Sequence, residues 1–272
     1  MNHGIHFISG LPRAGSTLLA AILRQNPRLH AGMTSPVGAL FGALLREMSQ
    51  ANEGAVFIDD AQREAVLRSL FDAYYHRLHP EKLVFDTNRV WCARLPAVTA
   101  LFPQAKIIAC VRDVPWIMDS IERLVRRNRF EPSGIFKFDP AGTVYSRVEQ
   151  LGGGAGMVGF AWNALREACF GEHADRIMLL TYETLTADPA RALAAVYDFI
   201  GAPPFAHYFA HVSYDEAREF DARLGTPGLH DVGPVVRAAP RRTVLPPDLF
   251  ARYEPDSFWR DPARTPAGLR IV

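Results

Sequence analysis

A short loop between Gly10 and Thr17 carries the residues best suited to binding an anion. Two glycines, Gly10 and Gly15, bracket four residues, and the hydroxyl side chains of Ser16 and Thr17 follow at once. This is the spacing of a phosphate-binding loop, in which successive backbone N–H groups and the positive end of a helix surround a phosphate. The loop therefore predicts a site for a phosphorylated nucleotide.

The loop departs from the pattern of the nucleotide triphosphatases at one position. Those proteins place a lysine directly before the final hydroxyl residue, where it contacts the β- and γ-phosphates. Here that position is Ser16, and the cation inside the loop is Arg13. The difference argues against hydrolysis of ATP or GTP. A glycine turn that matches the spacing by chance is the other interpretation.

A second candidate anion site follows another apolar run of the chain. Arg112 comes directly after the run Ile107–Val111, and Ser120 stands eight residues later in a segment of helical pattern. An arginine at a strand end and a hydroxyl on the adjoining helix can hold a phosphate. The alternative is a structural ion pair of Arg112 with Asp113 or Asp119. Two separate anion sites would suit a nucleotide that carries phosphates at both ends of its ribose.

A parallel sheet is the element that would bring these residues to one edge. Four short apolar runs are typical of buried parallel strands, and helical patterns lie between and after them. This alternation predicts an α/β fold, with a parallel β-sheet flanked by helices on both faces and ligands at the carboxyl ends of the strands. Asp59 or Asp60, and Asp188 before Pro189, are expected to cap two of the helices. The predicted strands are Ile5–Ser9, Leu83–Asp86, Ile107–Val111 and Ile177–Thr181, and the predicted helices are Ser16–Gln25, Pro36–Met48, Ala61–Leu78, Ala93–Leu101, Pro115–Arg127, Met157–Cys169 and Ala190–Ile200.

Composition and charge narrow the class of protein further. The 272 residues are 49% hydrophobic with a formal net charge of +1, which favours a globular domain and gives no support for a nucleic-acid partner. No apolar run approaches the ~20 residues of a membrane span. We expect a single domain over residues 1–272, with a core over about 4–201 and an irregular C-terminal layer over 202–272.

The cysteines suggest a reducing, cytoplasmic location. Cys92, Cys110 and Cys169 are too far apart for a zinc site and too few for a disulfide framework. The sequence shows no metal-binding cluster, so we expect no metal ligand.

These motifs resemble those of the sulfotransferases that use 3′-phosphoadenosine 5′-phosphosulfate, which have a fold like that of the P-loop nucleoside triphosphatases. Residues 12–19 resemble the family's 5′-phosphosulfate loop, with Arg13 taking the part of the triphosphatase lysine. Arg112 and Ser120 match the family's 3′-phosphate pair in type and spacing. The resemblance therefore implies that the nucleotide is the co-substrate and that no metal is required.

The likeness is greatest to the bacterial branch nearest the tyrosylprotein sulfotransferases, and it covers about residues 5–201. The shared segments, in order, are Leu101-Phe102-Pro103, Trp162-Asn163, and Tyr182-Glu183-Thr184-Leu185 followed by Asp188-Pro189. A late basic loop closes over the 3′-phosphate in the family, and Arg237, Arg241 or Arg242 could serve here, with a solvated basic turn as the alternative. By this resemblance the nucleotide-binding residues are Pro12, Arg13, Ala14, Gly15, Ser16, Thr17, Arg112, Ser120, Tyr182 and Arg241.

Catalysis of sulfuryl transfer requires positioning and stabilisation of charge on the leaving phosphate, for which we expect Arg13 and Thr17. The base for the acceptor is harder to find. By resemblance, two branches of the family place a glutamate and a histidine at the positions of Thr34 and Asn88. The nearest carboxylate is Asp86, a candidate catalytic residue whose alternative role is to hydrogen-bond the residues that follow it. His30 and His230 are further options.

Two other functions compete with sulfuryl transfer. A small-molecule kinase could use the same loop, but it would need Mg²⁺ and a lysine or its equivalent. A non-catalytic nucleotide-binding module stays open because a conventional base is missing. The acceptor itself is a hydroxyl or amine of unknown kind, on a small molecule, saccharide or peptide. Pro36–Met48 and Arg129–Val148 are expected to shape its pocket.

Overall fold

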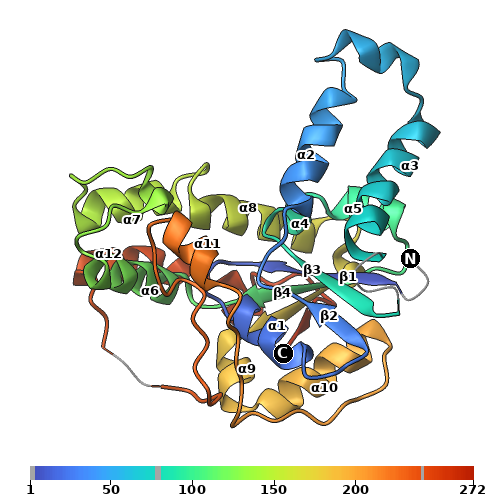
Figure 1. Cartoon of the computed structure of the whole chain (residues 1–272). Coiled ribbons are helices and arrows are strands. Elements are labelled where there is room, and N and C mark those ends of the chain that lie inside the picture. Colours follow the sequence, from blue (N-terminus) through green and yellow to red (C-terminus); the bar gives the residue numbers. More distant parts are fainter. Residues whose placement is uncertain (1–3, 77–80, 240–241) are drawn as a thin grey trace.

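A six-stranded sheet forms the centre of the computed structural model, which describes residues 4–76, 81–239 and 242–272 (Figure 1). The strand order is β2-β3-β1-β4-β5-β6, and every neighbouring pair is parallel. The predicted α/β fold with a parallel sheet is therefore confirmed. The strands are β1 (Ile5–Gly10), β2 (Leu29–Ala31), β3 (Leu83–Thr87), β4 (Ile107–Val111), β5 (Ile177–Thr181) and β6 (Arg270–Ile271).

Helices cover both faces of the sheet. In Figure 1, α4, α5 and α8 lie above the sheet, and α1, α9 and α10 lie below it. Every residue of β1, β4 and β5 is buried, as expected for central strands of a parallel sheet. None of the helices in the described residues is long and apolar enough to cross a membrane. The helices are α1 (Ser16–Leu23), α2 (Val37–Glu47), α3 (Asp60–Phe71), α4 (Val90–Ala93), α5 (Leu95–Leu101), α6 (Val114–Arg127), α7 (Val144–Gly152), α8 (Met157–Phe170), α9 (Tyr182–Ala187), α10 (Pro189–Ile200), α11 (Arg218–Arg223) and α12 (Pro247–Tyr253).

Two helix caps that the sequence predicts are present. The Asp59 side chain accepts a hydrogen bond from the Gln62 backbone N–H at 2.7 Å, at the start of α3. Asp188 accepts from the Arg191 backbone N–H at 3.1 Å, and Pro189 occupies the first turn of α10. Such caps satisfy N–H groups that have no partner within the helix, so the local sequence sets where each helix begins.

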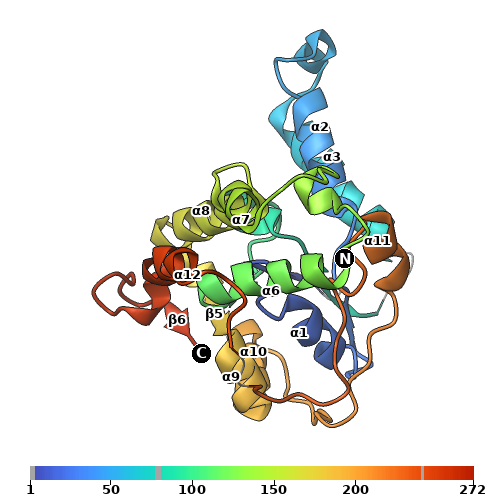
Figure 2. The ribbon, with the colours of Figure 1, turned by 90° about the vertical axis from the view of Figure 1, so that its left-hand side faces the viewer.

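Helices α2 and α3 project from the rest of the protein as an arm (Figures 1 and 2). The helix predicted over residues 61–78 is interrupted, because α3 ends at Phe71 and a π-helical turn, Asp72–His76, follows it. Residues 77 and 78 of that prediction lie outside the described residues. The π-helical turn directs the Tyr75 hydroxyl to the Asp86 carboxylate, and such turns are often found at functional sites.

The C-terminal part, predicted to be irregular, contains α11, α12 and β6. The two-residue strand β6 pairs with β5, as Figure 2 shows at the edge of the sheet. The Thr181 backbone N–H donates to the Val272 carbonyl at 2.8 Å, and that of Val272 donates to Leu179 at 2.9 Å. A strand of two residues and a helix as polar as α11 leave no periodic pattern, which is why the sequence did not predict them.

The three cysteines are free and buried. Burial raises the pKa of Cys92 to about 11 and that of Cys110 to about 12, and it also raises the pKa of Cys169. A thiol in such surroundings stays protonated at neutral pH and is therefore inert.

Candidate active site

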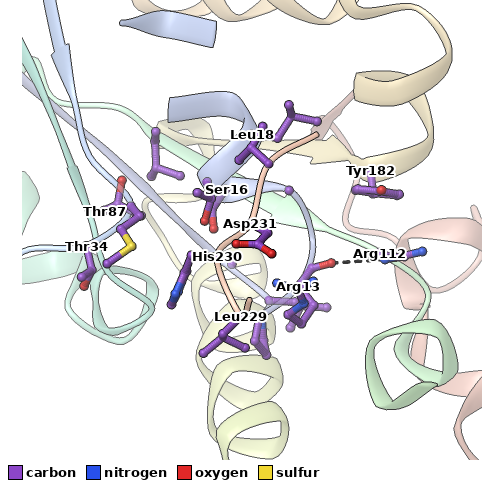
Figure 3. Close-up of a pocket in the computed structure, with 18 of the residues that line it drawn as sticks. Arg13, Ser16, Leu18, Thr34, Thr87, Arg112, Tyr182, Leu229, His230 and Asp231 are labelled. Carbon is purple, nitrogen blue, oxygen red and sulfur yellow. Dashed lines mark hydrogen bonds between the residues drawn. The ribbon is translucent and has the colours of Figure 1, made fainter. Parts of the chain in front are cut away.

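A cavity of about 630 Å³ lies where the carboxyl ends of four strands meet (Figure 3). Gly10 and Thr87 are the last residues of β1 and β3. Arg112 directly follows β4, and Tyr182 directly follows β5. All four residues line the cavity. This is the place where open α/β sheets bind ligands. The volume lies within the roughly 300–1,000 Å³ of small-molecule sites.

The loop from β1 to α1 depends on its two glycines. Gly10 has φ +95° and Gly15 has φ +96°, a left-handed conformation that side chains rarely adopt. A Cβ atom on Gly10 would lie 2.3 Å from the Cys110 carbonyl oxygen on β4. Gly15 caps α1 without any side-chain hydrogen bond, so the N–H groups of the first turn remain available to an anion.

Arg13 connects the two predicted anion sites. Its Nε donates to the Ser120 hydroxyl on α6 at 3.1 Å, and its carbonyl accepts from the Arg112 guanidinium at 3.4 Å. Arg13 has φ +58°, a conformation that costs a non-glycine residue about 1–3 kcal/mol. Residues in strained backbone conformations are often found at functional sites.

Arg112 is a desolvated cation at the end of β4. Its guanidinium lies 4.1 Å from the centre of the Tyr182 ring. Burial lowers the pKa of Arg112, and Tyr182 and Glu183 only partly oppose this. Within the described residues Arg112 forms no ion pair with Asp113 or Asp119; Asp113 binds Arg260 at 2.8 Å and Asp119 binds Arg123 at 2.9 Å. A guanidinium without a carboxylate partner is suited to bind a phosphate.

Most of the predicted nucleotide-binding residues are brought together. Ala14 and Ser120 are buried and do not line the cavity. Arg241 lies outside the described residues. Of the other two late arginines, Arg237 lines the cavity, and the Arg242 carbonyl accepts a hydrogen bond from Arg123. The predicted residues that line the cavity are Pro12, Arg13, Gly15, Ser16, Thr17, Arg112 and Tyr182.

Asp86 lies beside the cavity and not in its lining. It is fully buried in β3, and its carboxylate accepts hydrogen bonds from Ser35 Oγ at 2.5 Å, Trp91 Nε1 at 2.6 Å and the Tyr75 hydroxyl. Burial raises its pKa, and the three hydrogen bonds oppose the rise. Since three donors already surround the carboxylate, Asp86 holds α2, α4 and the π-helical turn to the sheet.

The end of the cavity away from Arg112 contains the two positions where a base was expected. Thr34 and Asn88 both line the cavity, and neither can take a proton at neutral pH. His30 lies on β2 against the Tyr75 ring and is not part of the lining. Within the described residues, no group of three or more His, Cys, Asp or Glu side chains could hold a metal ion.

Sequence reasoning missed two residues, Arg89 and Asp221. Arg89 lines the cavity, burial lowers its pKa, and no carboxylate in the described part of the chain pairs with it. Its position two residues after β3, similar to that of Arg112 directly after β4, was the available signal. Asp221 binds His230, which also lines the cavity. Nothing in the sequence connects Asp221 with the loop, some 200 residues earlier.

The sequence of the chain is similar to those of known sulfotransferases. A family model described as "Sulfotransferase family" matches residues 6–207, well over half of the chain. Protein-tyrosine sulfotransferase 1 of Homo sapiens is 31% identical over 113 residues, which cover 39% of this chain and 30% of the human protein. The same protein of Rattus norvegicus is 30% identical over 41% of this chain and 32% of its own length. The match thus spans about a third of these relatives.

Solved sulfotransferase structures are similar at lower identity. The sulfotransferase domain of the Synechococcus PCC 7002 olefin synthase is 21% identical, with 93% of this chain and 94% of that chain covered and a TM-score of 0.49. A sulfotransferase of Alicyclobacillus acidocaldarius is 16% identical, with coverages of 82% and 90% and a TM-score of 0.49.

Proposed function

The chain belongs to the sulfotransferase family, and we propose that it transfers the sulfuryl group of 3′-phosphoadenosine 5′-phosphosulfate to a hydroxyl or amine acceptor. The observation that carries this proposal is the pair of cationic sites in one cavity. The loop lies at the end of β1, and Arg112, free of any carboxylate in the described residues, lies at the end of the neighbouring strand β4. A nucleotide with phosphate groups on both sides of its ribose matches this pair.

The donor would be held mainly by the backbone. The N–H groups at the start of α1, with the hydroxyls of Ser16 and Thr17, suit the 5′-phosphosulfate. Arg112 suits the 3′-phosphate, and Tyr182 fixes the plane of its guanidinium. Arg13 contacts both regions, so a nucleotide that spans them would meet one continuous, pre-organised surface.

The reaction itself would depend on charge stabilisation. As the sulfuryl group leaves the 5′-phosphate, negative charge grows on the phosphate, where Arg13, Thr17 and the loop amides can stabilise it. Arg89 is another cation in the cavity for which no carboxylate partner exists among the described residues. We assign it to the oxygens of the transferred sulfuryl group, because a desolvated guanidinium requires an anion in the occupied site.

Asp86 has a supporting role in this proposal and does not act as the base. Its carboxylate is enclosed by Ser35, Tyr75 and Trp91 and does not reach the cavity lining. A base must lie within hydrogen-bond reach of the acceptor proton.

Two coarser features belong to the same proposal. β6 joins the C-terminal part to the sheet, which supports one domain over residues 1–272. Three free, buried cysteines support a reducing compartment such as the cytoplasm.

Calorimetric titration with 3′,5′-adenosine bisphosphate and with 5′-AMP tests the two-site donor. We expect the bisphosphate to bind more tightly than 5′-AMP. Arg112→Ala should remove about 10- to 100-fold of that affinity, since a hydrogen bond to a charged group contributes about 1.5–3 kcal/mol. Arg191→Ala is the control, because Arg191 is exposed on α10.

Equal affinity for the two nucleotides, or no loss in Arg112→Ala, would overturn the two-site proposal. Incubation with ³⁵S-labelled donor and a panel of phenols, alcohols and amines then separates an enzyme from a binding module. Transfer from ATP that a chelator abolishes would instead support a kinase.

A further inference from the structure

We propose that His230, oriented by Asp221, is the general base that takes the proton from the acceptor, an inference that rests on the proposed sulfuryl transfer. Both residues belong to the segment after α10, remote in sequence from the loop and from the two positions where a base was expected. The proposal supplies the proton acceptor that Thr34 and Asn88 cannot provide.

The contact between the two residues defines which imidazole nitrogen is free. Asp221 is buried, with 2% of its side chain exposed. One carboxylate oxygen lies 2.5 Å from His230 Nδ1, and the other accepts from the His230 backbone N–H at 2.9 Å. An ionised carboxylate only accepts hydrogen bonds, so Nδ1 carries the hydrogen and Nε2 keeps its lone pair. This tautomer is the one that a general base requires.

His230 lies where an acceptor would approach the donor. Figure 3 shows Arg112 and Tyr182 at one end of the cavity and Thr34 and Thr87 at the other, with His230 between them and nearer the second end. An acceptor bound at that end would place its hydroxyl between the imidazole and the donor.

Burial is the main reason that the imidazole of His230 is neutral. Burial lowers its pKa below the ordinary 6.5, and the cations Arg13 and Arg89 lower it further, while Asp221 opposes them. The Phe220 ring packs edge-on against the imidazole at 5.6 Å, and the neighbouring Asp231 is exposed. The imidazole is therefore unprotonated at neutral pH and able to accept a proton.

Three hydrogen bonds support the segment that contains Asp221 and His230. The Thr226 backbone N–H donates to the Asp221 carbonyl at 2.9 Å, and the Thr226 hydroxyl bonds Ser133. The Gly134 backbone N–H donates to the Leu224 carbonyl at 2.7 Å. Such support holds the imidazole in one orientation, and proton transfer in catalysis requires a fixed orientation of the base.

The proposed step is balanced without any further reactant. As the acceptor oxygen attacks sulfur, its proton passes to His230 Nε2 and a new S–O bond forms. The bond from sulfur to the bridging phosphate oxygen breaks, and its electron pair stays on the phosphate beside Arg13. Asp221 stabilises the imidazolium, which later releases its proton to water.

The test uses His230→Gln and Asp221→Asn, with His211→Gln as the matched control, since His211 is exposed and outside the lining. Transfer to phenol and to 4-nitrophenol is measured from ³⁵S-labelled donor. His230→Gln should lower kcat for phenol by about 10²–10⁴-fold. The loss should be much smaller for 4-nitrophenol, which is largely ionised and needs little help from a base. Asp221→Asn should also slow phenol sulfation and move the acidic limb of the pH–rate profile to lower pH.

The affinity for 3′,5′-adenosine bisphosphate separates this inference from the donor proposal. It should be unchanged in all three variants. An equal loss of rate with both phenols, or an unchanged rate in His230→Gln, would overturn the role of His230 while leaving the donor site intact. A wild-type chain that binds no bisphosphate would instead overturn the proposed function.

Nitrogen-15 NMR of the histidine rings tests the tautomer without any acceptor. We expect His230 to be neutral at pH 7.5, with hydrogen on Nδ1 and none on Nε2. In Asp221→Asn we expect His230 to lose its preference for the tautomer with hydrogen on Nδ1. Hydrogen on Nε2 of the wild-type protein would contradict the proposal directly.

Discussion

The two ends of the cavity are built in different ways. The proposed donor end consists of strand ends and one tight loop, and backbone hydrogen bonds hold it: the Leu11 N–H donates to the Cys110 carbonyl at 2.8 Å. The proposed acceptor end combines residues just before α2, residues after β3 and the segment that carries His230, and all three line the cavity. The strands and the loop of the first end follow local sequence patterns, whereas the second end joins segments that lie far apart in the sequence, so the sequence predicts the first end more readily.

The same contrast separates the two buried carboxylates. Asp86 is surrounded by three neutral donors and holds helices to the sheet. Asp221 faces an imidazole at the cavity wall. The sequence alone does not distinguish these two aspartates, whereas their neighbours suit Asp86 to structural support and Asp221 to the catalytic role that we propose.

The largest expected effect on stability comes from a substitution at Gly10, where the backbone of the loop lies close to β4. Gly10→Ala would bring a Cβ within 2.3 Å of the Cys110 carbonyl at φ +95°. We expect it to lower the free energy of unfolding by roughly 2–6 kcal/mol, the sum of strain and overpacking. Urea denaturation measures the change. Gly42→Ala in α2 meets nothing within 4 Å and should instead stabilise by about 0.5–1 kcal/mol. Equal stability of the two variants would refute the contact.

Replacing Arg13 separates function from stability at the donor end. Arg13→Gly removes the cation and relieves the left-handed strain at φ +58°. We expect transfer to fall by about 10²–10³-fold. Unfolding free energy should stay within about 1 kcal/mol of wild type, because lost hydrogen bonds offset relieved strain. A stable variant with full activity would remove Arg13 from the mechanism.

Asp86→Asn tests whether the two carboxylates differ as described. Transfer should be far less affected than the about 10²–10⁴-fold that removal of a general base costs. Burial raises the pKa of Asp86 in the folded protein. The Asp86 side chain therefore stabilises the wild type at a pH below its pKa in the unfolded chain. This stabilisation is lost as the pH rises through its pKa in the folded protein. The stability of wild type relative to Asp86→Asn should therefore fall as the pH rises. Urea midpoints over a pH series would show a flat difference if the carboxylate were not buried.

The smallest expected effect concerns the aromatic support of Arg112. Tyr182→Ala removes a ring 4.1 Å from the guanidinium, a contact that contributes about 0.5–2 kcal/mol. The affinity for 3′,5′-adenosine bisphosphate should fall by about 2- to 30-fold. Tyr182→Phe should keep most of it, which calorimetry can resolve. A larger loss in Tyr182→Phe than in Tyr182→Ala would show that the hydroxyl matters and the ring does not.

Whether the sequence predicts a structural feature depends on how far apart in the sequence the interacting residues lie. Four strands, the loop and the caps at Asp59 and Asp188 follow from local patterns, and the structure contains them. β6 has only two residues, so it exists through its pairing with β5 alone.

The site divides in the same way. Arg13 was recognisable from the spacing of the glycine loop, and Arg112 from its position directly after a buried strand. Asp221 and His230 are nine residues apart, and a turn after α11 brings their side chains together. Their approach to the loop depends on tertiary contacts such as Gly134 with Leu224, which no local pattern records.

The buried cysteines can report how often the native structure opens locally. With their pKa values raised, Cys92 and Cys110 are closed to thiol reagents until the sheet separates from the helices. The rate at which such a reagent labels them therefore measures how often the native structure opens, without an added probe. Slower labelling in the presence of a nucleotide would give its binding energy in the same measurement.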